Sequence, residues 1–399
     1  MNRKRVYFLR FFSVLCILAL IGELSYIVYC KCFQEKKYVY FDGVNAVVST
    51  NKYYAAAGSN NDNDSHYEKA KISKFNLKKE KTFEKLYNVG YNSAFFGIVL
   101  DGEDIVAVGS YEKTEEDHNE SIRRALIVKF DKKGNIVFEK DFQMLDNSKF
   151  TSIIQVGTDY LVTGQSIYKN NKIGDKEGGA ILVKYDKDGK LLWSRTYGSS
   201  KSAIFNDVKV INNYIYTVGT DENYLGIIVK YDLDGNFITY NDYKTTDSLG
   251  FSGIESIGDY IYISGAVRCG TNDNDAMIVK YDLGCEYIDQ VVYTGQGIER
   301  FNKLMVDDLN NLVAIGTMAI ETQDDGVSEY NYDGIVAKYD ANLKYIDSVS
   351  YGDERDDYFT DIFFVDDMYL VVGYSSYEDG SYMSKFIRYS KALKVLNVE

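Results

Sequence analysis

Short apolar runs separated by polar, Gly-containing turns recur along this chain from residue 40 to its end. Three marks return in each period: a Phe followed three residues later by a branched apolar residue, a Gly that closes a second apolar run, and a basic residue followed by an aromatic one. The Phe positions are Phe41, Phe95, Phe150, Phe205, Phe251, Phe301 and Phe359; the Gly positions are Gly58, Gly109, Gly164, Gly219, Gly265, Gly316 and Gly373; the basic residues are Lys74, Lys129, Lys184, Lys230, Lys280, Lys338 and Arg388. Self-similarity at a period near 50 residues predicts a propeller or a solenoid.

Each period contains four runs with strand character. In the third period they are 150–156, 160–163, 180–185 and 191–197, and the tight turn 186–189 joins the last two, with Gly189 supplying a positive φ. The third run begins with the stretch Ala180 to Val183, which is apolar on both faces, so both faces must be covered. In a propeller the neighbouring blades cover them.

Seven periods of four runs fit the range of closed propellers, and no polar caps of an open solenoid are evident. Every period starts with its first run and ends with its fourth. We therefore predict an all-β, seven-bladed β-propeller of four-stranded antiparallel blades over residues 40–399, closed by packing between blades without an exchanged terminal strand.

One interval within the period varies in length. From the basic residue to the next Phe the interval is always 21 residues, whereas the Gly-to-Lys interval, which contains the loop between the second and third strands, ranges from 11 to 22 residues. In a propeller this loop emerges on the same face as the connection between blades. The loop-bearing face is thus where we expect binding, because loops on a rigid scaffold commonly carry function.

The recurring pattern of Phe-x-x-Ile, an apolar strand ending in Gly and Lys-Tyr-Asp-x-x-Gly resembles the bacterial SBBP-type seven-bladed β-propeller repeats. The resemblance covers Tyr40 to Glu399 and rests on structural motifs, not on catalytic ones. It implies an exported propeller whose biochemical role is commonly unassigned. Gly284-Cys285 and Ala341-Asn342 depart from the pattern and are expected to weaken two of the turns.

The N-terminus has a different character. Four basic residues within residues 1–10 precede an apolar segment, 11–29, which predicts a cytoplasmic basic end, a transmembrane signal-anchor helix and a juxtamembrane linker over 30–39. The propeller would then be extracytoplasmic, on a single-pass protein of the cell membrane. The apolar core is also of signal-peptide length, so secretion after cleavage stays open as the alternative.

The net charge restricts the classes of ligand that this chain could bind, and the cysteine positions restrict its disulfides. The formal net charge is -14, which argues against nucleic acid, and the Gly-to-Lys intervals hold 21 carboxylates against 10 Lys or Arg. Such loops either attract cations, basic peptides or aminated glycans or keep an exported protein soluble. Cys269 and Cys285 belong to different strand ends of one period, so we expect two unpaired thiols.

Two groups of residues are candidates for sites. Polar residues that follow the motif Phe are expected to line the channel near the loop-bearing face, and the binding candidates among them are Asn206, Asp207, Asn302, Lys303 and Asp361. These side chains could equally satisfy neighbouring backbone groups. The loop residues Asp62, Asp64, Asp273 and Asp275 resemble fragments of a Ca²⁺ site, although none of these runs has the spacing of an EF-hand; no other cofactor is expected.

Catalytic signals are sparse. The chain has only two histidines, His66 and His118, which excludes a three-His metal site and is a poor basis for a His-dependent triad. We therefore expect a membrane-anchored, non-enzymatic binding or scaffold module that recognises a protein or glycan through its acidic loop-bearing face. The alternative is a carbohydrate-active enzyme, a glycosidase or lyase, that uses carboxylates at the channel mouth.

Overall fold

The structure is a computed structural model. The chain divides into two compact units, Met1–Val39 and Tyr40–Glu399. The structure describes residues 42–398 except for 51, 62–66, 77–79, 88, 116–119, 168–177, 200–202, 244–247, 269–273, 294–296, 325–326, 353–354 and 378–380. The predicted basic segment, signal-anchor and linker over 1–39 lie outside the described residues. Within the described part, no helix is long and apolar enough to cross a membrane.

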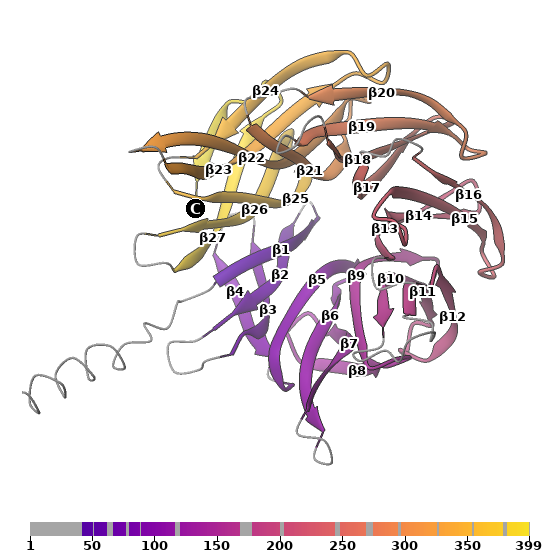
Figure 1. Ribbon diagram of the computed structural model, residues 1–399. Helices are drawn as coiled ribbons and strands as arrows, with labels where there is room; N and C mark the ends of the chain where they lie inside the picture. Colours follow the sequence, from indigo (N-terminus) through magenta and orange to yellow (C-terminus); the bar gives the residue numbers. More distant parts are fainter. Residues whose placement is uncertain are drawn as a thin grey trace, which may run out of the picture. The chain divides into compact units, whose positions relative to one another are not determined.

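The described residues form 28 β-strands (Figure 1). They are β1 (Asp42–Ser49), β2 (Tyr53–Asn60), β3 (Lys69–Asn76), β4 (Lys81–Tyr87), β5 (Tyr91–Asp101), β6 (Asp104–Glu115), β7 (Glu120–Phe130), β8 (Ile136–Phe142), β9 (Asn147–Val156), β10 (Asp159–Ile167), β11 (Gly178–Tyr185), β12 (Leu191–Tyr197), β13 (Ile204–Ile211), β14 (Tyr214–Thr220), β15 (Gly226–Asp232), β16 (Phe237–Asp242), β17 (Ser248–Ile257), β18 (Tyr260–Arg268), β19 (Asn274–Asp282), β20 (Tyr287–Tyr293), β21 (Gly297–Val306), β22 (Leu312–Asp324), β23 (Val327–Tyr339), β24 (Tyr345–Tyr351), β25 (Asp357–Val365), β26 (Met368–Ser376), β27 (Tyr382–Ser390) and β28 (Val395–Val398).

Consecutive strands pair antiparallel in groups of four, which we number repeat 1 (β1–β4) to repeat 7 (β25–β28). Single parallel bridges join repeats 2 and 3 at Arg123 and Asn147, and repeats 5 and 6 at Asn274 and Ile298. The four strands predicted for the third repeat are confirmed; the first three extend beyond the predicted runs, and the fourth matches its run. The sequence pattern therefore locates strands well wherever apolar runs are bounded by turns.

The register explains why a Gly recurs within the second strand of every repeat. Each motif Gly lies opposite the first-strand residue that precedes a β-bulge, as Gly219 lies opposite Phe205. A Cβ at Gly219 would lie 1.9 Å from the carbonyl oxygen of Ile204, and the other six motif glycines have a backbone carbonyl oxygen within 2.5 Å of the same position. No side chain fits there without moving the backbone.

The same register corrects the assignment of Phe41. Opposite Gly58 lies Val44, and the bulge follows it directly, so Val44 occupies the motif position in repeat 1. The 17-residue interval from Phe41 to Gly58 is thereby replaced by the usual interval of 14. In repeat 6 the interval is longer because the turn Asp307–Asn311 between β21 and β22 contains an additional residue.

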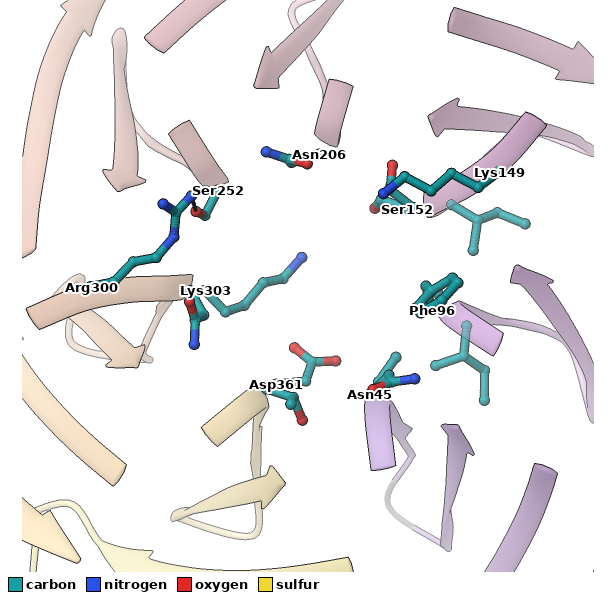
Figure 2. Close-up of a pocket in the computed structure, with 16 residues that line it drawn as sticks. Asn45, Phe96, Lys149, Ser152, Asn206, Ser252, Arg300, Lys303 and Asp361 are labelled. Carbon is teal, nitrogen blue, oxygen red and sulfur yellow. Dashed lines mark hydrogen bonds between the residues drawn. The ribbon is translucent and has the colours of Figure 1, made fainter. Parts of the chain in front are cut away.

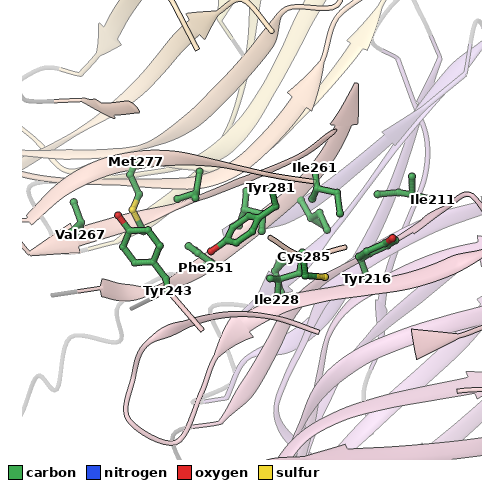
Figure 3. Close-up of a cluster of buried hydrophobic side chains, with 14 residues drawn as sticks. Ile211, Tyr216, Ile228, Tyr243, Phe251, Ile261, Val267, Met277, Tyr281 and Cys285 are labelled. Carbon is green, nitrogen blue, oxygen red and sulfur yellow. The ribbon is translucent and has the colours of Figure 1, made fainter. Parts of the chain in front are cut away.

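Hydrophobic clusters fill the interfaces between neighbouring repeats. Seven clusters are found in the described residues, and each draws side chains from two adjacent repeats. The cluster between repeats 4 and 5 contains Tyr216 and Ile228 from the former and Phe251 and Tyr281 from the latter (Figure 3). The prediction that adjacent units cover both faces of each third strand is confirmed, and this burial is the main driving force for folding.

Aromatic pairs lie at the centre of these interfaces. The aromatic residue that ends or directly follows the fourth strand packs on the motif Phe of the next repeat, as Tyr197 packs on Phe205 with ring centroids 5.9 Å apart. The corresponding pairs are Tyr87 with Phe95, Phe142 with Phe150, Tyr243 with Phe251, Tyr293 with Phe301, and Tyr351 with Phe359. The motif Phe of one repeat and the aromatic residue at the end of the preceding repeat therefore form one packing pair shared by two repeats.

Repeat 7 packs directly on repeat 1. Leu370 and Val372 of β26 share a cluster with Val44 and Tyr54, and Tyr54 also contacts the ring of Phe386 in β27. In Figure 1 strands β26 and β27 lie beside β1. Among the described residues, the strands of repeat 7 pair with one another and so do those of repeat 1, as the predicted closure without an exchanged strand requires.

The turn between the third and fourth strands contains a positive-φ residue that adapts to the preceding repeat. Gly189 has a φ of 77°, and a Cβ there would lie 2.7 Å from the ring of Phe138 in the preceding repeat. Gly134 and Gly235 similarly face Phe83 and Trp193. Where the preceding repeat has Thr239, Asp289 or Asp347 in place of that aromatic residue, the turn has buried Cys285, Leu343 or Leu393, with φ of 66°, 62° and 52°.

These substitutions correct the expectation that two of the turns would be weakened. The hydrogen bonds of the turn persist, because Asp282 and Asp340 accept bonds from the second and fourth following amides, as Asp186 does. Cys285 is a free, buried thiol, and burial raises its pKa to about 12. Cys269 lies outside the described residues.

The motif lysines hold the same end of the repeats together, as their presence in nearly every period predicts. Lys230 donates to the carbonyl oxygen of Leu283 in the next repeat at 2.7 Å, and Lys280 donates to that of Ala341 at 3.2 Å. Lys338 donates to the hydroxyl of Tyr369 in the next repeat at 2.8 Å, and it forms a buried ion pair with Asp307 of its own repeat. These three lysines therefore contribute to the packing between repeats.

The variable Gly-to-Lys interval is only partly loop. In repeats 2 and 6 the additional residues lengthen the hairpins β6–β7 and β22–β23. The corresponding residues of repeat 3, 168–177, lie outside the described part. The end of each repeat that bears these hairpins is also the end at which its first strand begins, because Asn147 pairs with Ile167 and Gly297 with Ile320. We call it the loop-bearing end.

Candidate binding site in the central cavity

The first strands of all seven repeats surround a cavity of about 400 Å³, here called the central cavity (Figure 2). The bulge in each first strand turns the residue after the motif position toward it. The residues that line it are Asn45, Ala46, Phe96, Gly97, Ile98, Lys149, Thr151, Ser152, Ile153, Asn206, Ser252, Arg300, Asn302, Lys303, Thr360 and Asp361. Its size lies within the range of about 300–1,000 Å³ that is usual for small-ligand sites.

The binding candidates of the sequence analysis come together here. Asn206, Asn302, Lys303 and Asp361 all line the central cavity, and they come from repeats 4, 6 and 7. Asp207 is 5% exposed and reaches the site through its ion pair with Lys303. The position of these residues relative to the motif Phe is thus sufficient to group them.

Most bulge side chains link adjacent repeats by hydrogen bonds to the backbone. Asn206 Nδ2 donates to the carbonyl oxygen of Phe251 at 2.7 Å. The same bond joins Asn45 to Phe95, Thr151 to Phe205, Asn302 to Phe359, and Thr360 to Val44 across the closing interface. The sequence left open whether these side chains satisfy backbone groups, and these bonds show that they do. The bonds also fix the positions of the side chains around the cavity.

Three charged groups lie deeper in the cavity. Lys303 Nζ is 2.8 Å from Asp207 Oδ2, and Asp361 lies close enough to act on both. Burial disfavours the charged ammonium of Lys303, but Asp207 and Asp361 together outweigh it and raise its pKa. Burial raises the pKa of Asp361 to about 6, although Lys303 opposes the shift.

The carboxylates of this group are engaged in structural hydrogen bonds. Asp361 accepts from the amides of Val47 at 2.8 Å and of Ile362 at 2.9 Å. Asp207 likewise accepts from the hydroxyl of Ser152 and from two backbone amides, those of Val208 and Ile254. Each carboxylate thus joins its own repeat to the next, which restricts its access to a substrate.

The sequence analysis missed several cavity residues, and three of them, Phe96, Lys149 and Arg300, differ in chemistry from their equivalents in the other repeats. Phe96 occupies the bulge position in repeat 2 and is 37% exposed. Lys149 and Arg300 directly precede the motif Phe in repeats 3 and 6, toward the loop-bearing end. A comparison of the repeats could have found them, because the residue types at these positions differ from those at the equivalent positions of the other repeats.

The two cations at this end have no carboxylate partner among the described residues. The side chain of Lys149 has no hydrogen bond or ion pair there, and burial, with a smaller contribution from Arg123, lowers its pKa. Arg300 donates to the carbonyl oxygen of Leu249 at 3.2 Å and to Ser252 Oγ at 2.8 Å, both neutral, and burial lowers its pKa. The cavity therefore exposes positive charge in a chain of net charge -14.

The candidate Ca²⁺ ligands do not add a site in the described part. Asp275 is 5% exposed within β19, whereas Asp62, Asp64 and Asp273 lie outside the described residues. No group of three or more His, Cys, Asp or Glu with metal-binding geometry occurs among the residues that the structure describes.

Comparisons with known proteins show the fold alone. No family model and no curated protein matches the chain. The β-propeller domain of the Trilobed protease from Pyrococcus furiosus, described as having an open velcro topology, is 12% identical, covers 90% of this chain and 96% of its own, and has a TM-score of 0.50. The fold is β-propeller-like. Sqt1 from Chaetomium thermophilum (12% identity, 87% and 98% covered, TM-score 0.48) and an acylaminoacyl peptidase from Pyrococcus horikoshii (11%, 90% and 52%, 0.49) are also similar.

Proposed function

We propose that this chain is a seven-bladed, SBBP-type propeller, held at the cell membrane by its N-terminal segment with the propeller outside, that binds a protein or glycan without catalysis. The ligand meets the loop-bearing end, and the central cavity is the centre of the site. The observation that supports this proposal most strongly is the cavity itself, in which cations without a carboxylate partner in the described residues stand among carboxylates that join the repeats.

A binding role fits the chemistry of the cavity better than a catalytic one. General acid or base catalysis requires a group that can reach the reacting atom and exchange a proton with it. Asp207 and Asp361 are held by backbone amides from two repeats, which fixes their positions and occupies their oxygens. The side chains that remain accessible are amides, hydroxyls, one aromatic ring and cations, which are groups that orient a ligand.

The test is a binding screen of the full chain in detergent micelles against a glycan array and a panel of purified surface proteins. Ser252→Trp places a large side chain in the central cavity, whereas Thr158→Trp adds the same bulk to an exposed turn at the opposite end of repeat 3. We expect the ligand found with the unmodified chain to be lost with Ser252→Trp and retained with Thr158→Trp. Retention by both variants would contradict a site in the cavity.

The raised pKa of Asp361 supports a second candidate function, a carbohydrate-active enzyme. A carboxyl group with a pKa of about 6 is within the range in which enzymes use general acids. In that case the chain turns over a sugar substrate, and Asp361→Asn abolishes turnover while binding persists. Turnover that survives Asp361→Asn would remove Asp361 as the acid, and turnover of any kind would replace the binding proposal.

A further inference from the structure

We propose that the central cavity binds a single carboxylate-bearing sugar at the end of a glycan. Phe96 covers the apolar face of the sugar ring, and Lys149, with Arg300 on the other side of the cavity, attracts the carboxylate (Figure 2). This inference rests on the proposed binding function and specifies its ligand.

Phe96 is the clearest departure of the cavity from its own repeat pattern. Five of the seven bulge residues donate a side-chain hydrogen bond to the carbonyl oxygen at the motif position of the next repeat. The side chain of Phe96 cannot donate such a bond to Phe150, and the residue is 37% exposed in a cavity lined mainly by polar residues. An exposed aromatic ring that replaces a structural hydrogen bond is suited to a ligand with an apolar face and polar edges, as a sugar has.

The cations supply the second half of the recognition. Lys149 comes from β9, the strand that neighbours the strand of Phe96, and its ammonium has no ion pair among the described residues. Within that part of the chain, Arg300 donates its hydrogen bonds to neutral oxygens and retains further donors for a carboxylate. Partly buried cations in a low-dielectric cavity interact more strongly with an anion than exposed ones do.

The surrounding charge limits the ligand to one carboxylate. The seven Gly-to-Lys intervals carry a net charge of -11, from 21 carboxylates and 10 Lys or Arg. Among their described residues, the hairpins β6–β7 and β22–β23 lie at the loop-bearing end. This acidic surround repels a polyanionic chain but leaves a locally positive cavity for the end of a mostly neutral one. A cavity of about 400 Å³ has room for a terminal sugar, not for a folded peptide.

Isothermal titration of the full chain with two matched disaccharides tests the ligand class. One probe ends in glucuronate, and the other has glucose in the same place, so the pair differs only in the carboxylate. We expect the acidic probe to bind about tenfold more tightly, and we expect Lys149→Gln to remove this preference because the charged hydrogen bond is lost. Lys187→Gln, the same change in an exposed turn of the same repeat, leaves the preference intact.

Phe96→Asn separates a ligand contact from a structural one. Asn is the residue at the equivalent position of repeats 1, 4 and 6, so it restores a donor to the Phe150 carbonyl oxygen. We expect this variant to bind both probes at least tenfold more weakly while its melting temperature stays within about 3 °C of that of the unmodified chain. Unchanged affinity would remove Phe96 from the site.

The outcomes separate this inference from the function on which it rests. Equal binding of the two disaccharides, or a preference that survives Lys149→Gln, overturns the acidic-sugar inference. Binding of neither probe, together with a neutral glycan or protein ligand that Ser252→Trp removes, overturns the inference and leaves the binding module standing. Turnover of either probe overturns both.

Discussion

The packing between strand 4 of one repeat and the turn of the next gives a prediction that can be worked through quantitatively. In repeats 2 and 3 the pair is Phe138 and Gly189; in repeats 6 and 7 the equivalent pair is Asp347 and Leu393. Gly189→Leu therefore introduces the Leu that repeat 7 has at this position, but places it against the ring of Phe138.

The expected cost follows from the geometry. A Cβ at residue 189 lies 2.7 Å from the Phe138 ring, and overpacking of this kind costs about 1–3 kcal/mol. The φ of 77° adds about 1–2 kcal/mol for a residue other than Gly. Phe138→Thr removes the clash, so the double variant keeps only the backbone cost and the loss of the ring, and the two changes should couple favourably by about 2 kcal/mol.

A double-mutant cycle measured by urea denaturation checks this value. The four proteins are the unmodified chain, Gly189→Leu, Phe138→Thr and the double variant, and the free energy of unfolding is compared at equal slope. Gly134→Leu combined with Phe138→Thr is the matched control, because the ring next to Gly134 is that of Phe83. Additive costs in the first pair, or equal coupling in the control pair, would refute the proposed complementarity.

Three further predictions test the fold and the charged groups. Gly219→Ala should destabilise the chain by at least about 2 kcal/mol, since a Cβ there meets a carbonyl oxygen at 1.9 Å; an effect below about 0.5 kcal/mol by denaturation would contradict this. Lys338→Met should cost about 3–5 kcal/mol because it strands a buried carboxylate, whereas Lys187→Met should cost about 0–1 kcal/mol; equal effects in the same assay would refute the distinction. The pKa of Asp361 in the folded chain is raised to about 6, so the stability that this carboxyl contributes is present below about pH 4 and is lost as the pH rises through 6. The free energy of unfolding of the unmodified chain, minus that of Asp361→Asn, should therefore fall between these two pH values. A flat or rising difference would count against the raised pKa.

The strands and their packing could be predicted from the sequence because the same packing contacts recur in successive repeats. The motif Phe, the aromatic residue that ends the preceding repeat and the motif Gly each meet the same neighbours in successive repeats, so spacing alone identifies them. The assignment of Phe41 to the motif position is wrong because it rests on residue type, and the spacing to the motif Gly was not given priority. Hydrogen bonding places Val44 opposite Gly58, and the 14-residue interval is the sign of this in the sequence.

The site is predictable only where it obeys the pattern. Asn206, Asn302, Lys303 and Asp361 follow the motif Phe and are polar, so the sequence alone is enough to group them. Phe96 is apolar and reads as another core residue in sequence. Its exposure depends on the bulge that turns it into the cavity, and a bulge is set by pairing between strands, not by a local preference.

Turn residues show the same limit. Cys285 and Leu343 stand where other repeats have the Gly of the turn, and a side chain at positive φ is locally unfavourable, so the sequence predicts weakened turns. The structure shows both buried at the interface with the preceding repeat, where Thr239 and Asp289 stand in the place of an aromatic ring. A local preference is overridden here by packing across the interface, which only comparison of adjacent repeats could have suggested.

The central claim is that the cavity enclosed by the seven first strands is a ligand site built around Phe96 and Lys149. The most direct measurement is a crystal structure of the protein soaked with the glucuronate-ended disaccharide. The account predicts density for one sugar ring against Phe96, with its carboxylate within hydrogen-bond distance of Lys149 Nζ. A disaccharide bound elsewhere on the chain, with the cavity holding only water, would contradict it.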